Sequence, residues 1–338
     1  SSDMKGDHFV GKYYVKFESE YQKQISFNYF DPYYTLDNIS RGFNVFLRTV
    51  DYKQANLARF ETDSGGLGVN FGFPIDETQR VNFGLKAEYT ELSTGFYSAQ
   101  EIAEFIDDNG RDSLNFKLNL SWQKATLNRG IFADRGTSSQ VSFEAAIPGS
   151  GLEFYKVRYA GETYFPISNS WTLRLRTELG YGDAYGDTTA LPFYEHFFAG
   201  GFGSIRGFEN STLGPRTTPP LDLEGNPICW RDPCGDPFGG NLQVEASAEL
   251  IFPLPFVEDN RQFRPSLFLD VGNVFNTRCP RISVNCFGFD TEEIRYSTGF
   301  SVTWLTGMGP MSFALVKAFN TKDYDEEEAF QFELGKTF

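Results

Sequence analysis

Alternation between polar and apolar residues is the feature of this sequence that most restricts its fold. From Val81 to Thr90 every second residue is apolar, and the residues between them are Asn, Gly, Lys, Glu and Thr. The stretch from Leu114 to Gln123 repeats the pattern. A period of two residues indicates a β-strand with one dry face and one wet face. An all-β fold is therefore expected.

Fourteen segments carry this pattern, at approximate positions throughout the chain. They are His8–Glu18, Tyr21–Asp31, Ile39–Tyr52, Thr62–Phe73, Val81–Thr90, Leu114–Gln123, Ser139–Ile147, Glu153–Phe165, Ser170–Gly182, Asn241–Phe252, Gln262–Phe275, Glu292–Leu305, Pro310–Phe319 and Ala329–Phe338. One short helix is expected at 98–108, where Ile102, Phe105 and Ile106 recur at helical spacing.

The composition favours a membrane barrel over its alternatives. Aromatic residues make up 17% of the chain, yet the mean hydropathy is only -0.37. No apolar run reaches the roughly 18 residues that a transmembrane helix needs, whereas alternating strands suffice for a transmembrane barrel. A β-sandwich has no use for aromatic residues at its strand ends, and a large soluble enzyme would have helices between its strands.

Connections between the segments alternate in length. Short turns carry Pro32, Pro74, Pro166 and Pro310, whereas the intervening connections include the helix and an insertion at 183–240. Short turns at one rim and long loops at the other are typical of outer-membrane barrels. We therefore expect a transmembrane antiparallel β-barrel over residues 6–338, with the insertion as a long extracellular loop that folds inward. Residues 1–5 are expected to be a linker or an expression remnant.

The charge of the chain argues against a nucleic-acid-binding protein. The formal net charge is -15 and no basic patch is present, so no nucleic-acid partner is expected. The acidic run from Asp323 to Glu328 is expected to be a solvated loop.

The cysteines form two close pairs, Cys229/Cys234 and Cys279/Cys286, without CxxC spacing. Two local disulfides in an oxidising compartment fit better than a zinc site in a chain with only two histidines. No metal or other cofactor is expected.

One stretch, Tyr194–Pro215, does not alternate and is rich in glycine. At its centre stands a single cation, Arg206. A long loop folded into a wide barrel would bury this guanidinium, which then needs carboxylate or carbonyl partners. Glu249 and Asp270 lie on the polar faces of the two segments after the insertion, and Phe268 shares a face with Asp270. Arg206 is expected to tie the loop to these residues; the alternative is that it meets solvent inside the barrel.

Several motifs resemble the BamA family of outer-membrane β-barrel assembly proteins. The central one is Ile205-Arg206-Gly207-Phe208, followed by Asn210–Pro215. Further matches are Asp31–Asp37, Pro192–Glu195, Gly200-Gly201 and Phe330–Phe338. The resemblance implies a 16-stranded barrel, of which this sequence would supply about fourteen strands, the third to the sixteenth. The periplasmic POTRA domains that precede the barrel in this family are not expected in this sequence.

The resemblance also implies a function without catalytic residues or ATP: folding and inserting other outer-membrane proteins through a lateral gate. Arg206 would contact Glu249, Phe268 and Asp270. The C-terminal side of the gate would consist of Phe330, Phe332, Leu334, Gly335 and Phe338, with Gly335 as a kink. The implied partners are unfolded outer-membrane proteins, assembly lipoproteins and outer-membrane lipids. The alternatives are a TamA-like or two-partner-secretion translocase, or a passive porin-like channel.

Overall fold

The structure, a computed structural model, describes residues 11–19, 22–53, 57–95, 97–229, 234–253, 262–280, 282–307 and 309–335. The strands in these ranges are β1 (Gly11–Ser19), β2 (Gln22–Asp31), β3 (Ser40–Asp51), β4 (Phe60–Pro74), β5 (Gln79–Thr94), β6 (Asp112–Ala125), β7 (Gly136–Ala146), β8 (Phe154–Pro166), β9 (Thr172–Ala184), β10 (Leu242–Ile251), β11 (Phe263–Phe275), β12 (Arg295–Thr306), β13 (Gly309–Phe319) and β14 (Phe330–Leu334). The helices are α1 (Gln100–Asn109) and the 3-10 turns η1 (Phe193–Glu195) and η2 (Thr291–Glu293).

All the strands belong to one antiparallel sheet in which each pairs with its neighbours in sequence, from β1 to β14. Within the described residues no ladder joins β14 back to β1, so the sheet that they form is an open, curved wall. The predicted all-β barrel fold class is confirmed, and each predicted segment overlaps one observed strand.

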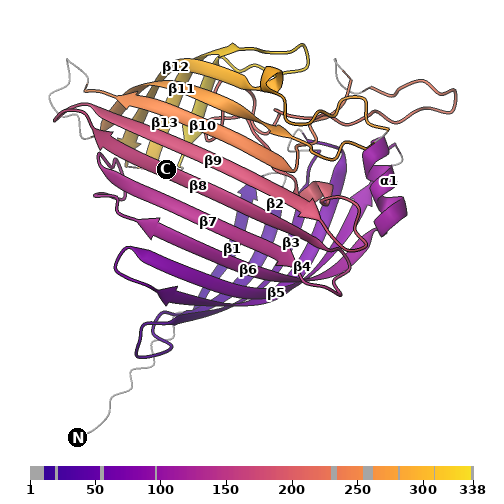
Figure 1. Cartoon of the computed structure of the whole chain (residues 1–338), viewed down its shortest axis with the longest axis horizontal. Helices are drawn as coiled ribbons and strands as arrows, with labels where there is room; N and C mark the ends of the chain where they lie inside the picture. Colours follow the sequence, from indigo (N-terminus) through magenta and orange to yellow (C-terminus); the bar gives the residue numbers. More distant parts are fainter. Residues whose placement is uncertain are drawn as a thin grey trace, which may run out of the picture.

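The two rims of the wall differ as the turn lengths predict. Figure 1 shows the tilted strands side by side, with α1 and the long connections gathered at one rim, on the right. The longest connection joins β9 to β10, and the helix lies between β5 and β6. Because antiparallel strands return the chain to the same rim after every second connection, these loops share one side of the wall.

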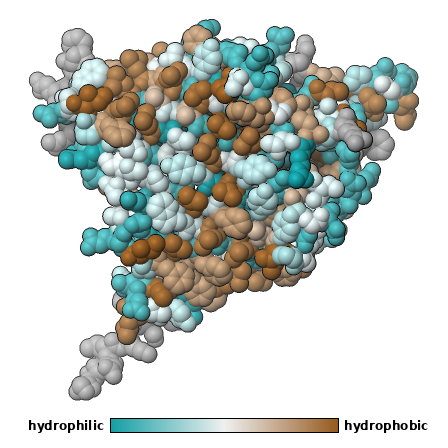
Figure 2. All heavy atoms as spheres, viewed as in Figure 1, coloured by the Kyte–Doolittle hydropathy of each residue, from teal (hydrophilic) through white to brown (hydrophobic). Residues whose placement is uncertain are grey.

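The outer face of the wall is apolar and the inner face is polar, as in a membrane barrel. On β11, Leu267 and Leu269 are both 52% exposed on the outer face, whereas Phe268 and Asp270 are 2% and 0% exposed on the inner face. Figure 2 shows hydrophobic side chains spread over the outer wall and hydrophilic ones toward its rims. The polar interior and apolar exterior are the arrangement that lipid outside the wall requires.

No helix in the described part of the chain is long and apolar enough to span a membrane.

The helix α1 covers the loop rim. Ile102 is fully buried in a cluster with Phe60, Leu92, Phe193 and Phe238, which come from the wall and from the long connection. Beside it, both carboxylate oxygens of Glu101 accept the Thr218 backbone N–H at 2.9 Å. The predicted amphipathic helix is therefore confirmed, and it holds the long connection in place.

Replacing Ile102 with Ala should lower stability by about 2–4 kcal/mol, because it opens a cavity in this cluster. Hydrogen exchange should rise in α1 and in the adjoining connection, while the strands below remain protected. Ile167→Ala, at a position that is 61% exposed, is the matched control and should change little. Equal effects of both changes would contradict the packing described.

Candidate functional site

The long connection between β9 and β10 returns toward the wall as a hairpin. Backbone bridges pair Phe197 with Gly240 and Ala199 with Leu213, and the segment Ile205–Glu209 forms its tip. We call this segment the loop tip. Gly207 has a φ of 89°, and a Cβ there would lie 2.7 Å from the Val316 Cγ1 atom on β13. The tip therefore needs glycine at this position both for its backbone and for its close approach to the wall.

Arg206 is the anchor of the loop tip. Its Nε and Nη2 atoms donate to the two carboxylate oxygens of Asp270 at 2.7 and 2.8 Å. Nη1 donates to Glu249 Oε1 at 2.7 Å, and Nη2 also donates to Ser247 Oγ at 3.2 Å. The guanidinium carbon lies 3.5 Å from the centre of the Phe268 ring. We call these five residues the arginine lock.

The charge balance of the arginine lock extends to a second arginine. Glu249 accepts from Arg174 at 3.1 Å as well as from Arg206, so a second cation shares in balancing the two carboxylates. Burial alone would lower the pKa of Arg206, but Asp270 and then Glu249 raise it above its ordinary value. Arg206 is thus a permanent cation with every part of its fork engaged.

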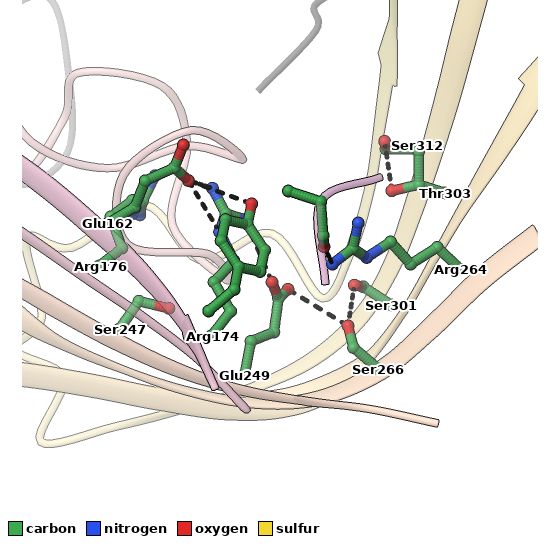
Figure 3. A network of polar contacts seen from close by, with 12 residues as sticks. Glu162, Arg174, Arg176, Ser247, Glu249, Arg264, Ser266, Ser301, Thr303 and Ser312 are labelled. Carbon is green, nitrogen blue, oxygen red and sulfur yellow. Dashed lines mark hydrogen bonds and ion pairs between the residues drawn. The ribbon is translucent and has the colours of Figure 1, made fainter. Parts of the chain in front are cut away.

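Figure 3 shows how the network continues along the inner wall from Glu249. Ser266 donates to Glu249 at 3.2 Å and pairs with Ser301 at 2.9 Å, while Arg174 donates to Glu162 on its other side. The cavity beside Glu249 and Ser266 measures about 60 Å³, room for water only, and a wider, more open space of about 630 Å³ lies beside Glu162 and Arg174. Nor do the described residues contain a cluster of His, Cys, Asp or Glu suited to a metal ion. The geometry is that of an anchor.

A second anchor holds the same loop against other strands of the wall. Glu195, at the end of η1, accepts from Lys117 on β6 at 2.7 Å and from Lys156 on β8 at 2.9 Å. Lys117 also contacts Glu88 on β5 at 2.9 Å. Burial would raise the pKa of Glu195, but the two lysines lower it well below its usual range. The loop is thus tied to strands on both sides of its own origin.

The acidic run is only in part the solvated loop that its composition predicts, because Asp323, Glu327 and Glu328 are exposed but the two carboxylates between them are paired. Asp325 is paired at 2.5 Å with the buried Arg295 of β12, and Glu326 contacts Arg216 of the long connection at 3.3 Å. Two arginines distant in sequence neutralise these carboxylates, so the connection between β13 and β14 closes over the loop.

The residues predicted for the gate lie on the terminal strand. Phe330, Phe332 and Leu334 are each about half exposed on the outer face. Gly335 has a φ of 81° directly after β14, and its N–H donates to the Pro310 carbonyl at 2.9 Å. Phe338 lies outside the described residues. Both cysteine pairs form disulfides, Cys229–Cys234 and Cys279–Cys286.

The structure thus brings Arg206 together with Glu249, Phe268 and Asp270, and it adds residues that sequence reasoning missed. These are Ser247, Arg174 and the group of Glu195, Lys117 and Lys156. Ser247 and Arg174 lie on the same inner face as Glu249, so the alternating pattern could have identified them as further candidates. Nothing in the sequence around Glu195 indicates its lysine partners, because they lie 78 and 39 residues away.

These features define a class: an outer-membrane β-barrel with its longest loop anchored inside the wall. The Omp85 superfamily domain matches residues 11–338. The outer membrane protein assembly factor BamA of Neisseria meningitidis serogroup B is 34% identical over 93% of this chain and 41% of its own length. The chain therefore belongs to the Omp85 superfamily, and it spans about two fifths of this curated relative.

Solved structures agree with this assignment. The crystal structure of BamA from Haemophilus ducreyi lacking POTRA domains 1-3 aligns with a TM-score of 0.82 and 28% identity, over 94% of this chain and 62% of that one. CdiB from Acinetobacter baumannii aligns with a TM-score of 0.52 and 10% identity, over 92% of this chain and 50% of that one, a likeness of fold alone.

Replacing Arg206 with Ala should cost about 3–5 kcal/mol, because it leaves Glu249 and Asp270 short of a buried cation. Limited proteolysis should then cut the long connection faster, and the thermal unfolding midpoint should fall. Arg158→Ala is the matched control: its ion pair with Glu178 is similar in length, at 2.7 Å, but the Arg158 side chain is 51% exposed. That change should cost at most about 1 kcal/mol. An Arg206→Ala protein as resistant as wild type would contradict the anchor.

His196 predicts a pH dependence of the same loop. Burial lowers its pKa to about 4, against a modest opposing effect of the hydrogen bond with the Phe238 carbonyl. Because the folded pKa of His196 lies below the unfolded value of about 6.5, the unfolded chain takes up the proton first as the pH falls. The stability that neutral His196 gives the folded loop is therefore complete above pH 6.5 and is lost as the pH falls toward 4. Protease resistance of the loop, measured from pH 7 to 4, should follow this window.

His196→Gln should flatten the profile between pH 6.5 and 4. The depressed pKa of Glu195 gives the same sign but acts only below its unfolded pKa of about 4.5, so the two windows are separable. An unchanged profile in the glutamine variant would show that another group titrates.

Proposed function

We propose that this chain is the membrane barrel of an assembly factor that folds and inserts other outer-membrane proteins without ATP. The observation that carries the proposal is the short ladder that holds β14: its five residues pair with β13, whereas the neighbouring strands are 11 and 12 residues long. Relatives named as outer membrane protein assembly factors support it. The barrel is one domain over residues 6–338, with its long loop at 183–240 on the extracellular side.

The mechanism follows from the physics of sheet edges. A free edge offers unpaired N–H and C=O groups to an incoming strand. In lipid such groups are costly when unpaired, so a substrate strand that pairs with the edge keeps its hydrogen bonds while it enters. No bond is made or broken in the covalent sense, and no ATP or catalytic group is needed. The seam beside β14 acts as a lateral gate.

The outer surface of β14 supports entry from the lipid side. Phe330, Phe332 and Leu334 form an apolar face only five residues long. A short apolar face thins the adjoining bilayer, which lowers the barrier to insertion. Phe338 and Gly335 are proposed to complete this side of the gate, with the positive φ of Gly335 turning the chain away from the strand.

The partners of this function are unfolded outer-membrane proteins, outer-membrane lipids and the lipoproteins of an assembly machinery. The principal alternative is a TamA-like or two-partner-secretion translocase with the same wall. A passive porin-like channel is disfavoured because the arginine lock and Glu195 hold the long loop against the inner wall.

A photo-crosslinking amino acid at Phe332 tests the gate. During insertion of an unfolded outer-membrane protein into proteoliposomes, this position should capture the substrate. The control position is Leu269, which is equally exposed on the outer face (52% against 50%) but lies on β11, a strand paired on both sides. Equal capture at both positions, or none at Phe332 while insertion proceeds, would refute insertion at this edge.

The same proteoliposomes separate the proposal from its alternatives. Insertion of the substrate should be faster than into liposomes without the protein. Delivery of the substrate into the vesicle interior would instead indicate a translocase, and a large steady ion conductance would indicate a porin.

A further inference from the structure

Gln331 on β14 contacts the backbone of the loop tip with both ends of its amide. Its Oε1 accepts the Gly207 N–H at 3.1 Å, and its Nε2 donates to the Phe208 carbonyl at 2.8 Å. The side chain is 2% exposed and points inward, opposite to Phe330 and Phe332. An amide that satisfies one N–H and one C=O of another segment replaces the pairing of a neighbouring strand.

The connection just before β14 extends this pairing. Phe208 bridges Glu327; the Glu328 N–H donates to the Gly207 carbonyl at 2.9 Å, and the Glu209 N–H to the Glu326 carbonyl at 2.8 Å. The loop tip is therefore a short added strand along residues 326–328, and Gln331 continues the contact onto β14 itself.

This contact compensates for weak pairing elsewhere on β14. The strand pairs with β13 over five residues, from Phe330 to Leu334. By comparison, β12 pairs with β13 from Tyr296 to Thr306. Since the ladder on β14 is short, the inward contact with the loop tip is a large share of what holds the strand.

We propose that Gln331 is a latch that makes the terminal strand and the arginine lock move as one unit, so that β14 is released only when the loop tip withdraws. Gln331 is then a positioning residue for the seam, and this role in insertion rests on the proposed function. The two residues that Gln331 contacts, Gly207 and Phe208, follow Arg206 directly in the chain. A displacement of Arg206 therefore displaces the groups to which Gln331 is hydrogen-bonded. Phe208 is fully buried against Leu213 and Ala318, which keeps the peptide aligned.

Hydrogen exchange of the protein in lipid nanodiscs measures the latch without any substrate. Gln331→Leu keeps the bulk of the side chain but removes its two hydrogen bonds to the loop tip, together with the one that Nε2 donates to Glu328 at 3.1 Å. Exchange at Phe330–Leu334 should therefore rise about tenfold or more. Arg206→Ala, which removes the lock and leaves Gln331 in place, should raise exchange in the loop tip and in β14 together.

Asn115→Leu is the matched control. Asn115 is also a buried inward amide, 1% exposed, that accepts a loop N–H, from Leu152 at 2.8 Å, but it lies on β6. Its loss should leave β14 exchange unchanged. Wild-type exchange at β14 in Gln331→Leu, or an equal rise in Asn115→Leu, would overturn the latch.

Gln331→Glu distinguishes hydrogen bonding from simple packing, because only hydrogen bonding would make the exchange of β14 depend on pH. A carboxylate can accept from Gly207, but it cannot donate to the Phe208 carbonyl until it is protonated. Until then it also faces the Glu328 carboxylate, to which Gln331 Nε2 donates at 3.1 Å. After correction for intrinsic exchange, protection of β14 should return in this variant as the pH is lowered, and wild type should show no such return. A pH-independent loss in the variant would overturn the hydrogen-bonded latch.

Substrate capture then separates the latch from the proposed function. With insertion intact, Gln331→Leu should increase photo-crosslinking of substrate at Phe332, because the seam opens more often. If exchange behaves as expected but wild type inserts no substrate, the proposed function fails and the latch stands. If wild type inserts substrate and Gln331→Leu alters neither exchange nor capture, the latch alone fails.

Discussion

The buried guanidinium of Arg206 is the interaction on which the interior of this protein depends. A cation away from water is tolerated only with full compensation, and here Asp270 and Glu249 provide it together with the face of Phe268. Both carboxylates are buried on the inner wall and need a cation as much as Arg206 needs them. The position of the loop against the wall satisfies all these charges together.

The other contacts of the loop follow from this position. With the tip at the wall, Glu195 reaches its two lysines at one end of the loop, and Glu101 of α1 accepts the Thr218 N–H at the other. The acidic connection before β14 closes over the loop through Arg216 and Arg295. The long connection is thus an internal strut tied to strands from β6 to β14, and the least paired of these strands is the one at the seam.

Much of this arrangement is predictable because it is local or periodic. Alternation gives the strands and their faces, so the positions of Glu249 and Asp270 in the pattern are enough to assign both residues to the inner wall. The helix around Ile102 follows from its spacing in the same way. The acidic run shows the limit of such reasoning: its composition predicts solvation, but whether Asp325 is exposed depends on Arg295, which lies 30 residues away.

By itself, the sequence determined the strand order, the two faces of the wall, the rim that carries the long loops and the pairs of cysteines that can bridge. These properties depend on residues that are near one another in the chain or that repeat with a fixed period. Only the tertiary structure decided which charges meet inside, that Glu195 is held by Lys117 and Lys156, and that Gln331 grips the peptide after Arg206. Such contacts join residues 39 to 124 positions apart, and they exist only once the wall has curved and the loop has folded against it.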